Sequence, residues 1–215
     1  MRPIRIEMQA FGPYLRQQTL DFRELGDRRV FLIHGPTGGG KTSLFDAMAY
    51  ALYGKASGGR PVEEMRSKHA PPELSTEVTF DFAIGSDHYR ARRRIDFRAK
   101  TRGANKGQVE QESLAEFMRL EEDGAGGYRE TEALASQDTK VTAAVTERIG
   151  LGVEQFLQVI ILPQGKFREF LAAKSQSREQ ILEALFKTTQ HKRLQDKLDE
   201  DSRTLGARLK ERQAE

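Results

Sequence analysis

Cysteine is absent from the 215-residue sequence, and its apolar runs are short. Without cysteine, the chain cannot form a disulfide scaffold, a thiolate zinc site or a cysteine nucleophile. Runs such as residues 159–162 are far too short to cross a bilayer, which takes roughly 20 apolar residues. Residues 1–7 alternate charged and apolar side chains, as a strand does and a signal peptide does not. We therefore expect a soluble, cytoplasmic protein that does not enter a membrane.

A large net excess of one charge is also missing, since 35 basic and 32 acidic residues give a net charge of only +3. Hydrophobic residues make up 37% and glycine adds 19 residues, so the chain can form a folded core. The length fits one domain, or one domain with an appendage. Because the overall charge is small, local clusters of charge carry more information than the sum.

The first third of the chain combines strand patterns with a glycine-rich loop. Residues 4–8 and 17–22 show the alternation of strands, and the continuous apolar run at residues 30–33 predicts a strand buried on both faces. Apolar positions across residues 41–53 predict a helix that ends at Gly54. The order of strand, glycine loop and helix indicates an α/β fold.

The middle of the chain predicts a sheet followed by a helix. Residues 76–83 and 88–97 have the pattern of an antiparallel hairpin that turns at Gly85 and Ser86. Residues 110–121 fit either a strand or a helix, and we predict a strand that continues the sheet. A further helix is expected over residues 139–149.

From residue 175 the composition changes, with no proline and a single glycine at Gly206. The spacing of Leu194, Leu198, Leu205 and Leu209 is typical of a coiled coil, with a single amphipathic helix as the alternative. The chain ends inside this helix without a cap, which predicts that it is the N-terminal piece of a longer protein. We therefore expect two parts, residues 1–174 and residues 175–215.

A phosphate-binding loop is the most specific motif. The pattern G-x-x-x-x-G-K-[ST] is matched by Gly35, Pro36, Thr37, Gly38, Gly39, Gly40, Lys41 and Thr42. Glycines let backbone N–H groups approach phosphate oxygens, and the following helix adds the positive end of its dipole. We expect Lys41 to reach the β- and γ-phosphates of ATP, Thr42 to bind Mg²⁺ and Ser43 to donate to the α-phosphate.

The acidic metal ligand that hydrolysis requires is not evident in the sequence. No apolar strand ends in two adjacent acids, and Asp81 and Asp96 lie inside alternating strands where we expect them to face solvent. Asp46 is too far along its helix to reach the metal. The sequence therefore predicts phosphate binding without the catalytic acid.

Several short segments occur in one order across residues 1–175. They are Phe11-Gly12-Pro13-Tyr14, the phosphate loop, Phe45-Asp46-Ala47, Ala51-Leu52-Tyr53-Gly54-Lys55-Ala56-Ser57, Met65-Arg66-Ser67, Tyr89-Arg90-Ala91-Arg92-Arg93, Leu162-Pro163-Gln164-Gly165-Lys166-Phe167 and Phe170-Leu171. This ordered set resembles the SbcC family of DNA-repair ATPases. The resemblance implies a P-loop NTPase of the ABC type, with mixed sheets around the phosphate-loop helix, in which this chain is the first head lobe and the root of a coiled coil.

The resemblance also implies the partners of the chain. A C-terminal lobe of the same protein would complete the ATPase, two heads would dimerise around ATP, and an SbcD-type metallonuclease would process double-stranded DNA ends and breaks at the nucleoid. The alternative is an SMC-like ATP-gated DNA clamp or scaffold without a nuclease partner. A transporter ATPase is disfavoured because a coil-like helix follows residue 175.

Four further site residues rest on the same resemblance. Gln164 would contact Mg²⁺ and the γ-phosphate, although a polar residue in a Pro-Gln-Gly turn is the alternative, and Lys166 replaces an acid expected in the family. Met65, Arg66 and Ser67 would lie near the base and ribose, with an ordinary surface loop as the alternative.

A basic stretch lies between His88 and Gly107. Its eight cations are Arg90, Arg92, Arg93, Arg94, Arg98, Lys100, Arg102 and Lys106, against a single acid, Asp96. Such clusters bind phosphate backbones, although a solvated sheet face is the ordinary explanation. The predicted DNA contacts are Arg93, Lys100, Arg102 and Lys106, with Arg178 and Lys187 on the later helix.

Overall fold

The computed structural model describes residues 1–26, 28, 30–56, 61–99, 109–159, 197–202 and 204–205. The chain divides into two units, residues 1–157 and residues 158–215. In the second unit, residues 197–202, 204 and 205 are helical. Within these described segments, no helix combines the length and apolar character needed to span a membrane.

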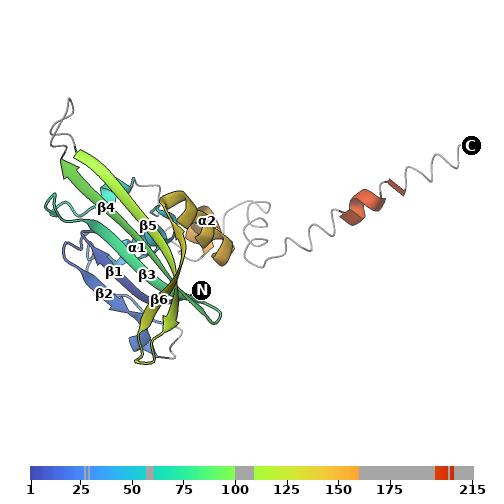
Figure 1. The fold of residues 1–215 in the computed structure, drawn as a ribbon, viewed down its shortest axis with the longest axis horizontal. Helices are drawn as coiled ribbons and strands as arrows, with labels where there is room; N and C mark the ends of the chain where they lie inside the picture. The colour runs from blue at the N-terminus through green and yellow to red at the C-terminus, as the bar shows by residue number, and fades with distance from the viewer. Residues whose placement is uncertain are drawn as a thin grey trace, which may run out of the picture. The chain divides into compact units, whose positions relative to one another are not determined.

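A six-stranded antiparallel sheet forms the body of the first unit (Figure 1). Its strands are β1 (Arg2–Gln9), β2 (Gln18–Asp21), β3 (Thr76–Ile84), β4 (Asp87–Ala99), β5 (Val109–Glu122) and β6 (Tyr128–Ser136). The order across the sheet is β2-β1-β3-β4-β5-β6, and every neighbouring pair is antiparallel. The predicted hairpin of β3 and β4 and the predicted strand β5 are therefore confirmed.

Helices α1 (Lys41–Tyr53), α2 (Asp138–Ile149) and α3 (Val153–Val159) accompany the sheet. Short 3₁₀ turns occur at Phe22–Leu25 and Val62–Met65. Helix α1 packs on β3 and β4, and α2 packs on β5 and β6. Alternate residues of the strands, such as Ile6, Phe80 and Phe117, are fully buried, so the core follows the two-residue period of the sheet.

The helices predicted at residues 41–53 and 139–149 are confirmed nearly to the residue. Gly54 and Gly150, at φ of 67° and 77°, end α1 and α2 in the left-handed conformation that glycine adopts without strain. Strand β6 was not predicted, because most of its side chains are exposed and its pattern lacks an apolar alternation. Pairing with β5 is what defines this strand.

The prediction for residues 30–33 is wrong. These residues form no strand with any described segment, and Val30 and Leu32 are 87% and 83% exposed. An apolar run becomes a central strand only if neighbouring strands and a covering layer enclose it. Residues 30–33 are not part of the described sheet. Among the described residues, this run therefore has neither neighbouring strands nor a covering layer.

The expectation that Asp81 and Asp96 face solvent is also wrong. Asp81 is only 3% exposed and accepts hydrogen bonds from Arg90 Nε and Nη2 at 2.7 and 2.8 Å. Asp96 accepts from the Ser75 hydroxyl and from Arg94. Both carboxylates lie on the strand face predicted by the alternation, but long cationic side chains of β4 bind them there.

Candidate nucleotide-binding site

The glycine-rich loop leads directly into α1. Gly38 and Gly40 have φ of 84° and 85°, a left-handed conformation that L side chains rarely adopt, and Gly40 is the N-cap of the helix. Gly39 N donates to Pro36 O at 3.1 Å, which closes the loop on itself. Residues 35–39 are exposed, so the loop is accessible to a ligand.

Lys41 folds back over this loop. Its Nζ donates to Gly35 O at 2.9 Å and to Pro36 O at 2.8 Å. The first turn of α1 contains no acidic residue, and no side chain caps its N-terminus. An ammonium group, glycine N–H groups and the positive end of a helix dipole are therefore brought together, which is the arrangement that binds phosphate.

The hydroxyl residues of the motif lie in the same turn of α1. Thr42 is exposed and Ser43 is partly buried. A threonine hydroxyl at this position could hold Mg²⁺ together with phosphate oxygens, so the residues present suit a nucleotide–magnesium complex. Across the described part of the chain, no group of three or more His, Asp and Glu residues could hold a metal ion by itself.

The turn at residues 11–14 supports the end of the phosphate loop. The Tyr14 hydroxyl donates to Gly40 O at 3.1 Å, and partial burial raises the pKa of this phenol. A Cβ on Gly40 would lie 2.6 Å from Tyr14 Oη and 2.8 Å from Pro13 Cγ. Gly12 approaches Ser43 closely enough that its own Cβ would lie 3.0 Å from Ser43 Oγ. Only glycine therefore fits at position 40.

Sequence reasoning did not assign Tyr14 or Gly12 to the site. The sequence did contain one signal for them. The segment Phe11-Gly12-Pro13-Tyr14 belongs to the ordered set of motifs, although it has no residues that would bind phosphate themselves. The structure gives the reason for its presence, because this turn holds the end of the phosphate loop.

The segment Met65–Ser67 reaches the same turn. Gly12 N donates to Met65 O at 2.6 Å, and Ser67 N donates to Ala10 O at 2.8 Å. The side chains of Met65 and Ser67 are buried, and the Arg66 guanidinium donates to Leu74 O, Pro71 O and Thr76 Oγ1. These contacts stabilise the protein itself, and a role toward the base and ribose stays a prediction.

Arg93 does not serve as a DNA contact, which corrects the sequence-based prediction. It is 1% exposed and lies on the helix side of β4. Its guanidinium donates to Ala51 O, Leu52 O, Asp138 Oδ1 and Thr142 Oγ1. Burial lowers the pKa of Arg93. A phosphate backbone cannot reach a side chain that the two helices enclose.

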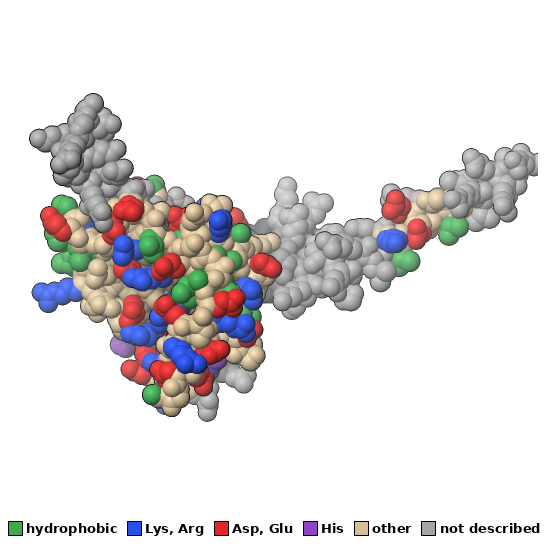
Figure 2. Space-filling model, in the orientation of Figure 1, with side chains coloured by type: hydrophobic (Ala, Val, Ile, Leu, Met, Phe, Trp, Pro, Cys, Tyr) green, Lys and Arg blue, Asp and Glu red, His purple; other side chains and the backbone are tan. Residues whose placement is uncertain are grey.

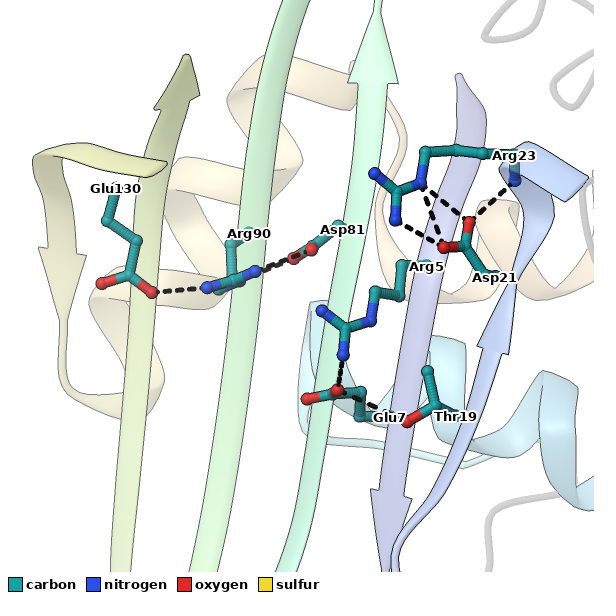
Figure 3. Close-up of polar contacts among 8 residues, drawn as sticks. All are labelled: Arg5, Glu7, Thr19, Asp21, Arg23, Asp81, Arg90 and Glu130. Carbon is teal, nitrogen blue, oxygen red and sulfur yellow. Dashed lines mark hydrogen bonds and ion pairs between the residues drawn. The ribbon is translucent and has the colours of Figure 1, made fainter. Parts of the chain in front are cut away.

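Arg90, Arg92 and Arg94 of β4 are paired with acids, mostly from neighbouring strands. Arg90 binds Asp81 and Glu130, Arg92 binds Glu77 and Glu116, and Arg94 binds Asp96 (Figure 3 shows the Arg90 contacts). The hydrogen bonds to Asp81 raise the pKa of Arg90. Red and blue side chains are interleaved on the face shown in Figure 2, so the described residues form no extended basic patch on that face.

The remaining predicted contacts lie outside the described residues. They are Gln164, Lys100, Arg102, Lys106, Arg178 and Lys187. Their roles toward the γ-phosphate and toward DNA stay predictions.

Comparison with known proteins gives a consistent result. The model of the AAA domain family matches residues 5–215. The chain is 42% identical over 202 residues to the SbcC component of the SbcCD nuclease of Vibrio cholerae, an alignment that covers 93% of this chain and 19% of that protein. It is 39% identical to the corresponding protein of Lactococcus lactis over 87% of this chain and 18% of that protein, and 33% identical to that of Staphylococcus aureus over 99% and 20%. The chain thus spans about a fifth of the length of these relatives, and the resemblance to SbcC is confirmed.

Proposed function

Because the chain belongs to the AAA domain family, we propose that it is the ATP-binding lobe of an SbcC-type DNA-repair ATPase. The observation that carries this proposal is the phosphate loop at the N-terminus of α1, where Lys41 lies over the carbonyls of its own loop. The similarity to components of the SbcCD nuclease selects the repair ATPase among proteins with such a loop.

Binding of ATP requires Lys41 to exchange two carbonyl oxygens for phosphate oxygens. The ammonium leaves Gly35 O and Pro36 O and moves to the β- and γ-phosphates, while the loop N–H groups turn toward the same oxygens. Thr42 holds Mg²⁺, which when bound neutralises charge on these phosphates. Gln164 is proposed to contact the γ-phosphate and so to distinguish ATP from ADP.

Hydrolysis is proposed to need a second lobe. Within the described segments, Asp81 and Asp96 are held by arginine partners, and Asp46 is buried in α1. The exposed apolar residues Val30 and Leu32, just before the phosphate loop, support completion of the sheet by another segment. We propose that this lobe supplies the acidic metal ligand, and that ATP then holds two heads together.

The partners follow from the relatives. They are named as components of the SbcCD nuclease, so we propose an SbcD-type nuclease and double-stranded DNA as partners of this chain. An SMC-like clamp that works without a nuclease remains the alternative. Co-purification of the native protein with a metallophosphoesterase distinguishes the two.

Calorimetry with Lys41→Ala tests the nucleotide site. We expect the wild-type chain to bind Mg–ATP and the variant to lose binding, because the charge-assisted bonds of Lys41 to phosphate disappear. Lys140→Ala removes the same charge from the exposed first turn of α2 and should leave the affinity unchanged. Retained binding by Lys41→Ala would overturn the proposed function.

A further inference from the structure

One buried arginine joins opposite ends of the two helices that pack on the sheet. From β4, Arg93 Nε donates to Ala51 O at 3.1 Å and Nη2 donates to Leu52 O at 3.3 Å, both in the last turn of α1. From the same guanidinium, Nη1 donates to Asp138 Oδ1 at 2.5 Å, and Nη2 donates to Thr142 Oγ1 at 2.8 Å. Asp138 and Thr142 lie in the first turns of α2.

The chemistry of helix ends explains why a guanidinium suits this position. The last carbonyls of a helix have no intrahelical donor and carry partial negative charge, so a buried cation stabilises them. The first turn of a helix favours a carboxylate, which Asp138 provides. Gly54 allows the approach, because a Cβ there would lie 3.1 Å from Arg93 Nη1.

Helix α1 connects this arginine to the phosphate loop. It begins at Lys41, ends at Tyr53 and is about 20 Å long. Most of its residues from Leu44 onward are buried, so the helix is expected to move as a rigid element. A second link extends from the same end, since the Tyr53 hydroxyl donates to Leu151 O at 2.9 Å, just before α3.

We propose that Arg93 is a positioning residue that couples the phosphate loop to the first turn of α2. When Lys41 exchanges its loop carbonyls for phosphate, the N-terminus of α1 is displaced, and the opposite end moves against Arg93 and Asp138. This inference rests on the proposed binding of ATP at the loop. It extends that function by naming the part of the protein that responds to the nucleotide.

Hydrogen exchange of the full-length protein, with and without a slowly hydrolysed Mg–ATP analogue, tests the coupling. In the wild type, the analogue should slow exchange in the phosphate loop and, by at least about fivefold, in the first turn of α2 around Val141. In Arg93→Lys, which lacks the forked donors, protection of the loop should persist while the response of α2 disappears.

Asp138→Asn provides a second variant. The side chain of Asp138 is 51% exposed in its pair with Arg93, so this replacement leaves the protein core intact. It should also lose the response of α2. Glu147→Gln is the matched control, since it neutralises an exposed carboxylate on the same helix, and it should respond as the wild type does.

The outcomes separate the coupling from the nucleotide site. A protected loop with an unresponsive α2 in the wild type would overturn the coupling, as would an unchanged α2 response in Asp138→Asn. Absence of any protection at the loop of the wild type would overturn the proposed function instead.

Discussion

The cations of β4 and the cation of the phosphate loop differ in what they contact. Arg90, Arg92 and Arg94 bind carboxylates of the sheet, whereas the Lys41 ammonium is held by two backbone carbonyls. An incoming phosphate must compete with a full negative charge on β4 but only with neutral oxygens at Lys41. The number of cations in a segment therefore does not locate an anion site, whereas the partners that those cations already have do.

The largest expected effect concerns the paired cations. Replacing Arg90 by Met leaves the Asp81 carboxylate buried without its main partner, since the side chain of Asp81 is only 4% exposed. Loss of one partner of a buried pair costs about 3–5 kcal/mol of unfolding free energy. Urea unfolding of the purified variant measures this loss.

The matched control for Arg90 is Arg129→Met. Arg129 and Glu121 form an exposed pair, with side chains 68% and 56% accessible, so its loss should cost no more than about 1 kcal/mol. Equal destabilisation by the two variants would contradict the view that the β4 arginines are structural.

An intermediate effect is expected at the phosphate loop, where Ala can replace Gly40 or Gly38. Both glycines have left-handed φ, but only at Gly40 would the new Cβ collide with Tyr14 and Pro13. Gly38→Ala should cost about 1 kcal/mol through backbone strain alone, and Gly40→Ala about 2–3 kcal/mol. The loss should appear in unfolding free energy and as weaker ATP binding, both measured on the same samples.

The difference between these two alanine variants is the informative quantity. If Gly38→Ala and Gly40→Ala weakened ATP binding equally, the support that Tyr14 gives to the loop would have no role in the site.

Local patterns predicted much of this fold. The glycine loop, the bounds of α1 and its end at Gly54 depend on periodicity and on residues adjacent in sequence, so the sequence suffices to find them. The same is true of the β3–β4 hairpin, which turns at Gly85.

The errors arose where distant residues decide. Arg93 was assigned to DNA, but its partner Asp138 lies 45 residues away, and Glu130 lies 40 residues from Arg90. Counting charges along one strand could not include acids from β3, β5 and β6. The prediction of a buried strand at residues 30–33 was wrong for the same reason. Such a strand needs neighbouring strands, and the described sheet places none beside this run.

The smallest expected effect concerns DNA binding by the cations that follow β4 in sequence. Arg93 is removed from the predicted set, and Arg178 and Lys187 stay in it later in the chain. The three predicted contacts that directly follow β4 are Lys100, Arg102 and Lys106. Each phosphate that a cation neutralises steepens the log–log salt dependence of affinity by about 0.9. Replacing all three by Ala should therefore flatten the slope for unrelated duplexes by up to about 2.7, and leave ATP affinity unchanged.

Arg92→Ala is the control that links the salt dependence of DNA affinity to the comparison between the β4 arginines and Lys41. Arg92 is 37% exposed but already binds Glu77 and Glu116, so its loss should leave the salt slope unchanged. A flattened slope with Arg92→Ala would mean that a cation paired with carboxylates still recruits phosphate, which would contradict the distinction between β4 and Lys41. An unchanged slope with the triple variant would mean that these three cations are only hydrated surface charges, and that DNA binds elsewhere on the protein.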